Sequence, residues 1–330
     1  MAPVGIDAAL RGPWTAYRTW AATARFHKDA LDFWRRWSLL LAIAGAVLAT
    51  LGQQIVHLAP EGGWEKWAYQ APGLLGSAAI ALAAYFSREI TGGDRERNWI
   101  RARSAAESLK SAIYLYRAGV PPFDGPAGAS QLLRRVRDIQ GTVADVLTRA
   151  LSQETDPDLS PLTVDAYLAL RVEDQVRFYD DRAATYQTKT DRLRAVMLVL
   201  GAVSVVFGLL STLSKTIPVA GWVAVTATVT AALTAYVQNQ RYQALMVLYQ
   251  ATARRLRELE SEWAASRKTE LDRVERDTFI QDCEATMAGE SGAWVAQWTP
   301  KKPDQAPGAA QPETDVTGPT IAGSPSHPNP

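Results

Sequence analysis

Residues that could carry out chemistry are few in this chain and lie far apart. The three histidines, His27, His57 and His327, fall on a predicted helical arm, at a predicted membrane edge and in the C-terminal tail. No two of them are placed to share a metal ion. The single cysteine, Cys283, excludes an intrachain disulfide and a zinc site made of cysteines alone. Walker A, HExxH and Ser/His/Asp patterns are also absent from the sequence. We therefore predict that the chain is not an enzyme and holds no metal ion or cofactor.

Two polar patterns have both a functional and a structural interpretation. The run Tyr-Asp-Asp-Arg at 179–182 could bind a cation, but we interpret it as the solvated side of an amphipathic helix. Thr226, Thr230 and Thr234 recur at four-residue intervals on one face of a predicted helix. This face is either the weakly polar wall of a pore or a packing surface whose hydroxyls bind backbone carbonyls one turn earlier. We favour packing and keep the pore as the functional alternative.

Charged residues are confined to certain blocks, although the mean hydropathy of -0.12 and the net charge of +1 resemble those of a soluble protein. Four stretches contain no Asp, Glu, Lys or Arg, namely 37–60, 67–87, 195–214 and 216–240. Each has roughly 20 residues or more, which at about 1.5 Å per residue crosses about 30 Å of hydrocarbon. A large soluble helical core is the alternative. We predict an all-α membrane protein with four transmembrane helices in two hairpins, spanning about 37–58, 67–87, 195–214 and 217–238.

Lysine and arginine collect at one end of each predicted span. Arg35 and Arg36 precede the first span, five arginines follow the second, and the second hairpin has the same bias. The two short loops within the hairpins contain only two basic residues, Lys66 and Lys215. By the positive-inside rule, both termini are predicted to be cytoplasmic. Because each arginine group is interleaved with Asp or Glu, this rule explains the basic residues without a lipid site, and we predict no nucleic-acid binding.

Helical arms with a 3-4 repeat of apolar residues flank each predicted hairpin. The repeat is clearest in 20–34, 99–116, 168–193 and 245–263. Such a stripe packs against a partner helix at a small crossing angle. We expect each arm to pair with the other arm of its own hairpin, giving long coiled-coil-like cytoplasmic extensions.

The chain divides into four segments by composition and pattern. The predicted segments are a first hairpin unit at 1–118, a linker with one amphipathic helix at 119–161, a second hairpin unit at 162–298, and a tail at 299–330. The tail is rich in Pro and Gly and has no aromatic residue, so it is predicted to be disordered. The two hairpin units share their architecture and indicate an internal duplication.

A pattern of aromatic, Arg and Glu positions covers the second unit. Its members are Arg171, Tyr179, Tyr249, Leu256, Glu284 and Trp294, within the runs 171–193, 241–256 and 279–294. On these residues the second half resembles the SLATT superfamily, the SMODS and SLOG-associating two-transmembrane effector domains. Within that superfamily it is most similar to a bacterial branch of domains of unknown function. The first half, roughly 17–118, resembles a second, more divergent copy.

The resemblance implies a multi-pass protein of the bacterial inner membrane that acts as an effector in a defence or conflict system. Such proteins are thought to form homo-oligomers in the lipid bilayer and disrupt it when a partner senses infection, commonly through a nucleotide signal. The family implies no catalytic residues. Since this chain carries no fused nucleotide-sensing domain, the trigger would come from a cytoplasmic sensor protein in trans or be sensed by the arms.

Three functional hypotheses follow. The first is a pore-forming or membrane-perturbing effector, and the second is a non-conducting scaffold whose cytoplasmic helices recruit a soluble partner. The third is a transporter or channel with a housekeeping role. The predicted spans contain no ionisable side chain except His57 near the outer end, which argues against ion-coupled transport. We carry the effector forward, with the scaffold as its alternative.

Overall fold

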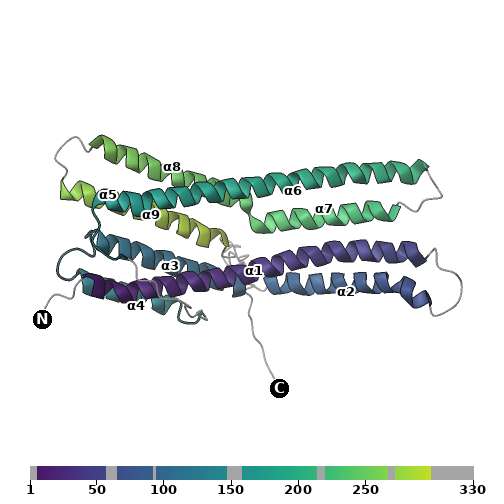
Figure 1. The fold of residues 1–330 in the computed structure, drawn as a ribbon, viewed down its shortest axis with the longest axis horizontal. Helices are drawn as coiled ribbons and strands as arrows, with labels where there is room; N and C mark the ends of the chain where they lie inside the picture. The colour runs from purple at the N-terminus through teal and green to yellow at the C-terminus, as the bar shows by residue number, and fades with distance from the viewer. Residues whose placement is uncertain are drawn as a thin grey trace, which may run out of the picture. The chain divides into compact units, whose positions relative to one another are not determined.

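The computed structural model describes residues 6–56, 65–91, 94–146, 158–213, 220–266 and 272–298. In chain order the elements are α1 (Ile6–Val56), α2 (Glu65–Thr91), α3 (Asp94–Arg117), α4 (Gly128–Thr142), α5 (Val164–Tyr167), the π-helical η1 (Leu168–Val172), α6 (Glu173–Leu213), α7 (Ala220–Gln240), α8 (Tyr242–Ser266) and α9 (Arg273–Trp298) (Figure 1). The described residues include no strand, so the predicted all-α class is confirmed. The predicted disorder of 299–330 falls outside the described residues.

The first hairpin is made by α1, which packs against α2 along one part of its length and against α3 along another (Figure 1). Its 51 residues run without interruption from the predicted arm into the predicted first span. The other side of the hairpin is divided, since α2 ends at Thr91 and α3 begins at Asp94. The arm pairing expected for the first half is therefore the contact between α1 and α3.

The second hairpin repeats this arrangement. The helix α6 is continuous over 41 residues and contacts both α7 and α8. The returning side is again divided, here at Arg241, whose φ of 48° lies in the left-handed region and ends the helical path. The arm pairing expected for the second half is the contact between α6 and α8. In both halves one unbroken helix joins the arm to the predicted span.

Small residues set the close approach of α1 and α2. A Cβ atom added to Gly52 would lie 2.5 Å from the backbone nitrogen of Gly73, and one added to Gly76 would lie 2.5 Å from that of Ala49. Backbone atoms cannot move aside as a flexible side chain can, so any larger residue must separate the helices. These glycines therefore serve close helix contact within one chain, of the kind found between membrane helices.

Replacing Gly76 by Ala should lower the free energy of unfolding by about 1–3 kcal/mol, because the added methyl group overpacks this contact. Gly201 of α6 provides the matched control, since a Cβ atom there meets nothing within 4 Å. Gly201→Ala should leave stability unchanged or raise it, because Ala is the better helix former by about 1 kcal/mol. Thermal melting of the purified full chain in detergent distinguishes the two. Equal shifts in both variants would contradict the close helix contact.

Two helical stretches among the described residues are long and apolar enough to cross a membrane, Ala9–Ile55 and Val164–Leu213. The most apolar 18-residue window of the second is 0% buried. The exposed large apolar residues over 195–213 are Val196, Leu198, Val199, Val205, Val206, Leu209, Leu210 and Leu213. A soluble helical core would bury such a window, whereas hydrocarbon would solvate it, so exposure of this extent favours a membrane protein over the soluble alternative.

The arms form one continuous core. The helix α9 contacts both α8 and α3, so a helix of the second half packs against the first half there, while α4 packs against α3 and α1. On the facing stripes of α6 and α8, Tyr179, Tyr186, Tyr242 and Tyr249 form a ladder of ring contacts, with 5.5 Å between the centroids of Tyr179 and Tyr249. Leu256 is completely buried in the same core.

Candidate functional site

The two halves of the chain meet around a buried arginine at the start of the second half. Thr163 caps the short helix α5, its hydroxyl accepting a hydrogen bond from the backbone nitrogen of Ala166 at 3.2 Å. The π-helical turn η1 follows directly and contains Arg171. Single π-turns inside helices are frequently found at functional sites. The turn places Arg171 in the core, where its side chain is 2% exposed.

Arg171 is held by Glu284 of α9 in a two-pronged ion pair. The distances are 2.8 Å from Nε to Oε1 and 2.9 Å from Nη2 to Oε2. The Tyr167 hydroxyl donates a third hydrogen bond to Oε1 at 3.1 Å. The Tyr114 ring of α3 lies 5.0 Å from the guanidinium carbon, within the range of a cation–π contact. Residues from α3, α5, η1 and α9 therefore share one buried polar cluster.

Electrostatics keep this cluster in one protonation state. Burial alone would lower the pKa of Arg171, but the charge and hydrogen bonds of Glu284 raise that pKa above its ordinary value. The guanidinium therefore stays charged. Burial, followed by the Glu284 carboxylate, raises the pKa of Tyr167 well above its usual range, so the phenol remains a hydrogen-bond donor. Burial likewise raises the pKa of the neighbouring Cys283 thiol to about 12, which makes it an inert, buried thiol.

A cavity of about 720 Å³ adjoins the cluster, with α3, α4 and α9 contributing its walls. Nη1 of Arg171 is buried and has no hydrogen-bond partner among the described residues, and the same is true of Oε1 of Gln131 on α4. Both residues line the cavity. The cavity walls thus combine elements from both halves of the chain. A change in the shape of this cavity would therefore alter the packing of both halves.

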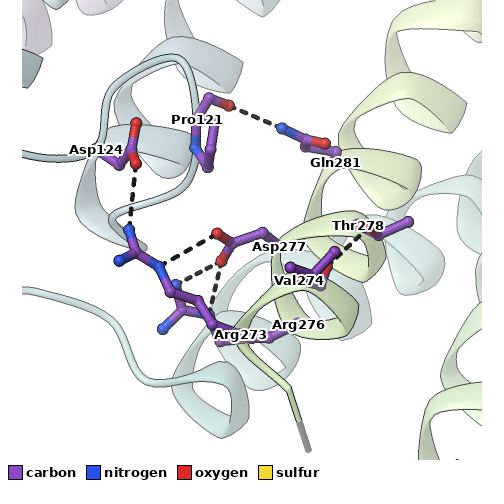
Figure 2. Close-up of polar contacts among 8 residues, drawn as sticks. All are labelled: Pro121, Asp124, Arg273, Val274, Arg276, Asp277, Thr278 and Gln281. Atoms are coloured by element: carbon purple, nitrogen blue, oxygen red, sulfur yellow. Dashed lines mark hydrogen bonds and ion pairs between the residues drawn. The ribbon is translucent and has the colours of Figure 1, made fainter.

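A second set of contacts fastens α9 to the loop between α3 and α4 (Figure 2). Nη2 of Arg273 lies 3.2 Å from Oδ2 of Asp124, and Nε2 of Gln281 donates to the Pro121 carbonyl at 3.0 Å. Asp277 in turn accepts a hydrogen bond from Nε of Arg276 at 2.9 Å and orders the first turns of α9. The loop predicted as part of the interdomain linker is therefore held against the second half.

The family-pattern positions divide between these two regions of the arms. Arg171 and Glu284 form the buried pair, whereas Tyr179, Tyr249 and Leu256 lie in the interface between α6 and α8. The side chain of Trp294 falls outside the described part of the chain. Sequence reasoning missed the contributions of Tyr167 and Tyr114, because no local pattern connects them to a glutamate on another helix.

The threonine hydroxyls on α7 bind backbone carbonyls of their own helix, as the packing interpretation of this face expects. The hydroxyls of Thr230 and Thr234 donate to the carbonyls of Thr226 and Thr230, both at 2.8 Å. Thr226 itself donates to the carbonyl of Val223 at 2.9 Å and is buried. Every hydroxyl of the stripe is thus satisfied within its own helix. A pore lined by this face stays a prediction.

The remaining candidates from the sequence fall as follows. Asp180 pairs with Arg257 of α8, so one member of the acidic run fastens α6 to α8, while Asp181 is exposed. Among the residues that the structure describes, no group of three metal-binding side chains is found. His27 lies on α1, whereas His57 and His327 are outside the described ranges.

Comparison with known protein families gives a separate match for each half. Residues 167–294 match the model of the SMODS and SLOG-associating 2TM effector domain 1. The second half of the chain is a SLATT domain. Residues 14–131 match a different model, described as a protein of unknown function, DUF4231, which is consistent with a divergent copy in the first half. No curated protein and no solved structure matches the chain.

The limits of the SLATT domain clarify the site. Tyr167, Arg171 and Glu284 all belong to the SLATT domain, since they lie within 167–294. Tyr114 and Gln131, which complete the surroundings of Arg171, lie within the match of the first half. The buried pair therefore closes the SLATT domain on itself, while the adjoining cavity lies at its boundary with the first-half domain. The SLATT match and the exposed apolar helices together make this a membrane protein.

Proposed function

We propose that this chain is an inner-membrane effector with four transmembrane helices, whose cytoplasmic arms keep it closed until a trigger acts on them. The observation that carries the proposal is the SLATT effector domain, whose long helix α6 leaves its apolar window entirely exposed. Such a surface is built for contact with lipid or with other membrane helices.

The hairpin geometry supports the proposal of four spans. The helices α2 and α7 pack against α1 and α6 over the stretches that carry no charged residue. Exposed apolar residues also lie on α2, including Leu74, Leu75 and Ile80. If α1 and α6 cross the bilayer, their antiparallel partners must cross it with them, since a polar backbone end is costly in hydrocarbon. The positive-inside bias supports a cytoplasmic location for both termini and all the arms.

Continuous helices supply a route for opening. Because α1 and α6 run unbroken from arm to span, a displacement of the arms moves the spans as well. The two hairpins touch through α1 and α7, where Nε1 of Trp222 donates to Oε1 of Gln54 at 3.1 Å. In the proposed mechanism a cytoplasmic sensor protein or its signal alters the arm core, the contact between hairpins changes, and several copies assemble to perturb the membrane.

A non-conducting scaffold is the second candidate. It is favoured by the hydroxyl pattern of α7, whose internal hydrogen bonds serve packing without a pore. In this alternative the interleaved arms present a stable cytoplasmic surface to a soluble partner, and the hairpins only anchor it.

The membrane potential of bacteria after brief induced expression tests the proposal, measured with a voltage-sensitive dye. We expect depolarisation specific to this chain when its cytoplasmic core is loosened, and none with an unrelated four-span protein expressed to the same level. Expression of the wild-type chain and of core variants in parallel separates a closed effector from an inactive one. An intact potential in every variant, at confirmed membrane insertion, would favour the scaffold.

A further inference from the structure

The cytoplasmic ends of the two hairpins enclose a second cavity, of about 400 Å³, that the sequence did not predict. We call it the interhairpin pocket. Its walls come from α1 and α3 of the first half and from α6, α7 and α8 of the second. Among the residues that the structure describes, seven lysines and arginines line it, against a single carboxylate, that of Asp32. Clefts lined by one sign of charge concentrate the field and attract counter-ions.

One of the seven cations is already neutralised. Arg35 is buried and donates to Oε1 of Glu96 at 3.1 Å. Five further lining cations are Lys28, Arg36, Arg182, Lys189 and Arg192. Within the described part of the chain, no carboxylate lies within ion-pair distance of Lys28, Arg182 or Lys189. The pocket therefore carries an excess of positive charge that its own residues do not balance.

The pKa of Lys28 reflects the same excess of positive charge in the pocket. Burial lowers the pKa of Lys28; Asp32 opposes this shift, while Arg182, Arg103 and Lys189 add to it. An anion placed among these groups would relieve their repulsion. Burial also raises the pKa of Tyr186 to about 12, so this phenol in the wall stays protonated and can donate a hydrogen bond to an anion.

The position of the pocket indicates which anions can reach it. Arg36 directly precedes the first apolar stretch, Arg192 lies three residues before the third, and Gln240 ends α7. In the proposed topology this level is the headgroup region of the cytoplasmic leaflet. Basic pockets between membrane helices on that side bind the headgroups of anionic lipids. Several arginine forks together favour phosphate, which they bind through paired hydrogen bonds.

We infer that the interhairpin pocket binds a ligand bearing two phosphate groups, and its position points to the headgroup of a diphosphate lipid of the cardiolipin class. The five cations Lys28, Arg36, Arg182, Lys189 and Arg192 exceed what one phosphate needs. The inference rests on the proposed membrane topology. A bound headgroup would bridge α1 and α6 and so hold the two hairpins together at the membrane surface.

The experiment uses the full chain purified in detergent and compares Arg182→Gln/Lys189→Gln with Arg177→Gln/Arg194→Gln. All four residues are exposed and lie on α6, but only the first pair lines the pocket, so both variants lose the same charge from the same helix. Binding is read as the shift in melting temperature on titration with cardiolipin, phosphatidylglycerol, phosphatidylcholine or pyrophosphate. The two anionic lipids are compared at equal phosphate concentration.

We expect cardiolipin to stabilise the wild type and the control variant equally, and to bind the pocket variant at least about tenfold more weakly, a difference of about 1.4 kcal/mol. Equal weakening in both variants, or none in either, would overturn the pocket. Stabilisation by pyrophosphate that is lost only in the pocket variant would uphold the phosphate site and assign its ligand to the soluble phase.

The outcome is separable from that of the proposed function, because binding in detergent requires no depolarisation. Pocket-dependent lipid binding in a chain that never depolarises cells would retain the site and count against the effector. Depolarisation by a chain that binds all lipids alike would retain the effector and count against the lipid site.

Discussion

Replacing Arg171 by Met should lower the free energy of unfolding by about 3–5 kcal/mol, because it leaves the Glu284 carboxylate buried without its partner. The side chains of both residues are almost fully inaccessible, at 2% and 3% exposure, so water cannot compensate. Equilibrium unfolding of the detergent-purified chain measures the effect. The same substitution should also loosen the contact between η1 and α9 and with it the cavity wall shared with the first half.

Arg273→Met is the matched control for this prediction. Arg273 also pairs with an aspartate on a distant segment, at 3.2 Å from Asp124, but its side chain is 62% exposed. Exposed ion pairs contribute about 0–1 kcal/mol, so we expect a small change. The double variant Arg171→Met/Glu284→Met should recover most of the lost stability, because it removes both charges together. If Arg171→Met destabilised no more than Arg273→Met, the buried pair would not stabilise the arm core.

The hairpins were predictable because the bilayer imposes a strong and local constraint on composition. A helix that crosses hydrocarbon must lack charge over about 20 residues, and this shows in a single sequence without any partner. The arms were predictable for a related reason, since a 3-4 stripe requires a neighbouring helix and the hairpin supplies one. Leu256 and Tyr179 were placed on the correct faces by this argument, and both are buried.

The buried pair and the interhairpin pocket were not predictable by such local arguments. Arg171 and Glu284 are separated by 113 positions, and their contact depends on how α9 returns to the arms. In the pocket, the interleaved charges along α6 suggested a balanced surface. The fold separates these charges, because Arg182 and Lys189 line the cavity, whereas Asp181 and Asp191 do not. Adjacent residues on a helix point about 100° apart, so net balance in sequence becomes imbalance in space.

The duplication is visible in architecture more than in residues. Each half has an unbroken helix followed by a divided one, with the second division at Arg241. Yet the family models that match the halves differ: the SLATT model matches residues 167–294, and the DUF4231 model matches residues 14–131. Under the proposed function, the divided return helix would let arm and span pack independently, while the unbroken helix would transmit movement between them. This combination is what a gated pair of hairpins requires under the proposed function.

Leu256→Asp should destabilise the arm core by several kcal/mol, because it places an unpaired carboxylate where the side chain is 0% exposed. Under the proposed function it should also deregulate the effector, giving depolarisation without a trigger. Val247→Asp is the control on the same helix, since Val247 is 62% exposed and a carboxylate there stays solvated. Melting in detergent and the dye signal in cells are recorded for both variants at equal membrane levels.

The two readouts of Leu256→Asp distinguish the remaining hypotheses. Lower stability together with a collapsed membrane potential would mean that the arm core holds the hairpins closed, because loosening one opens the other. Lower stability with an intact potential would mean that α6 and α8 pair without restraining the membrane helices, which is the behaviour of a scaffold. Melting as high as that of the control would contradict the burial of Leu256 between these helices. Tyr179→Glu on the facing stripe of α6 should reproduce whichever result Leu256→Asp gives, since the two residues belong to one core.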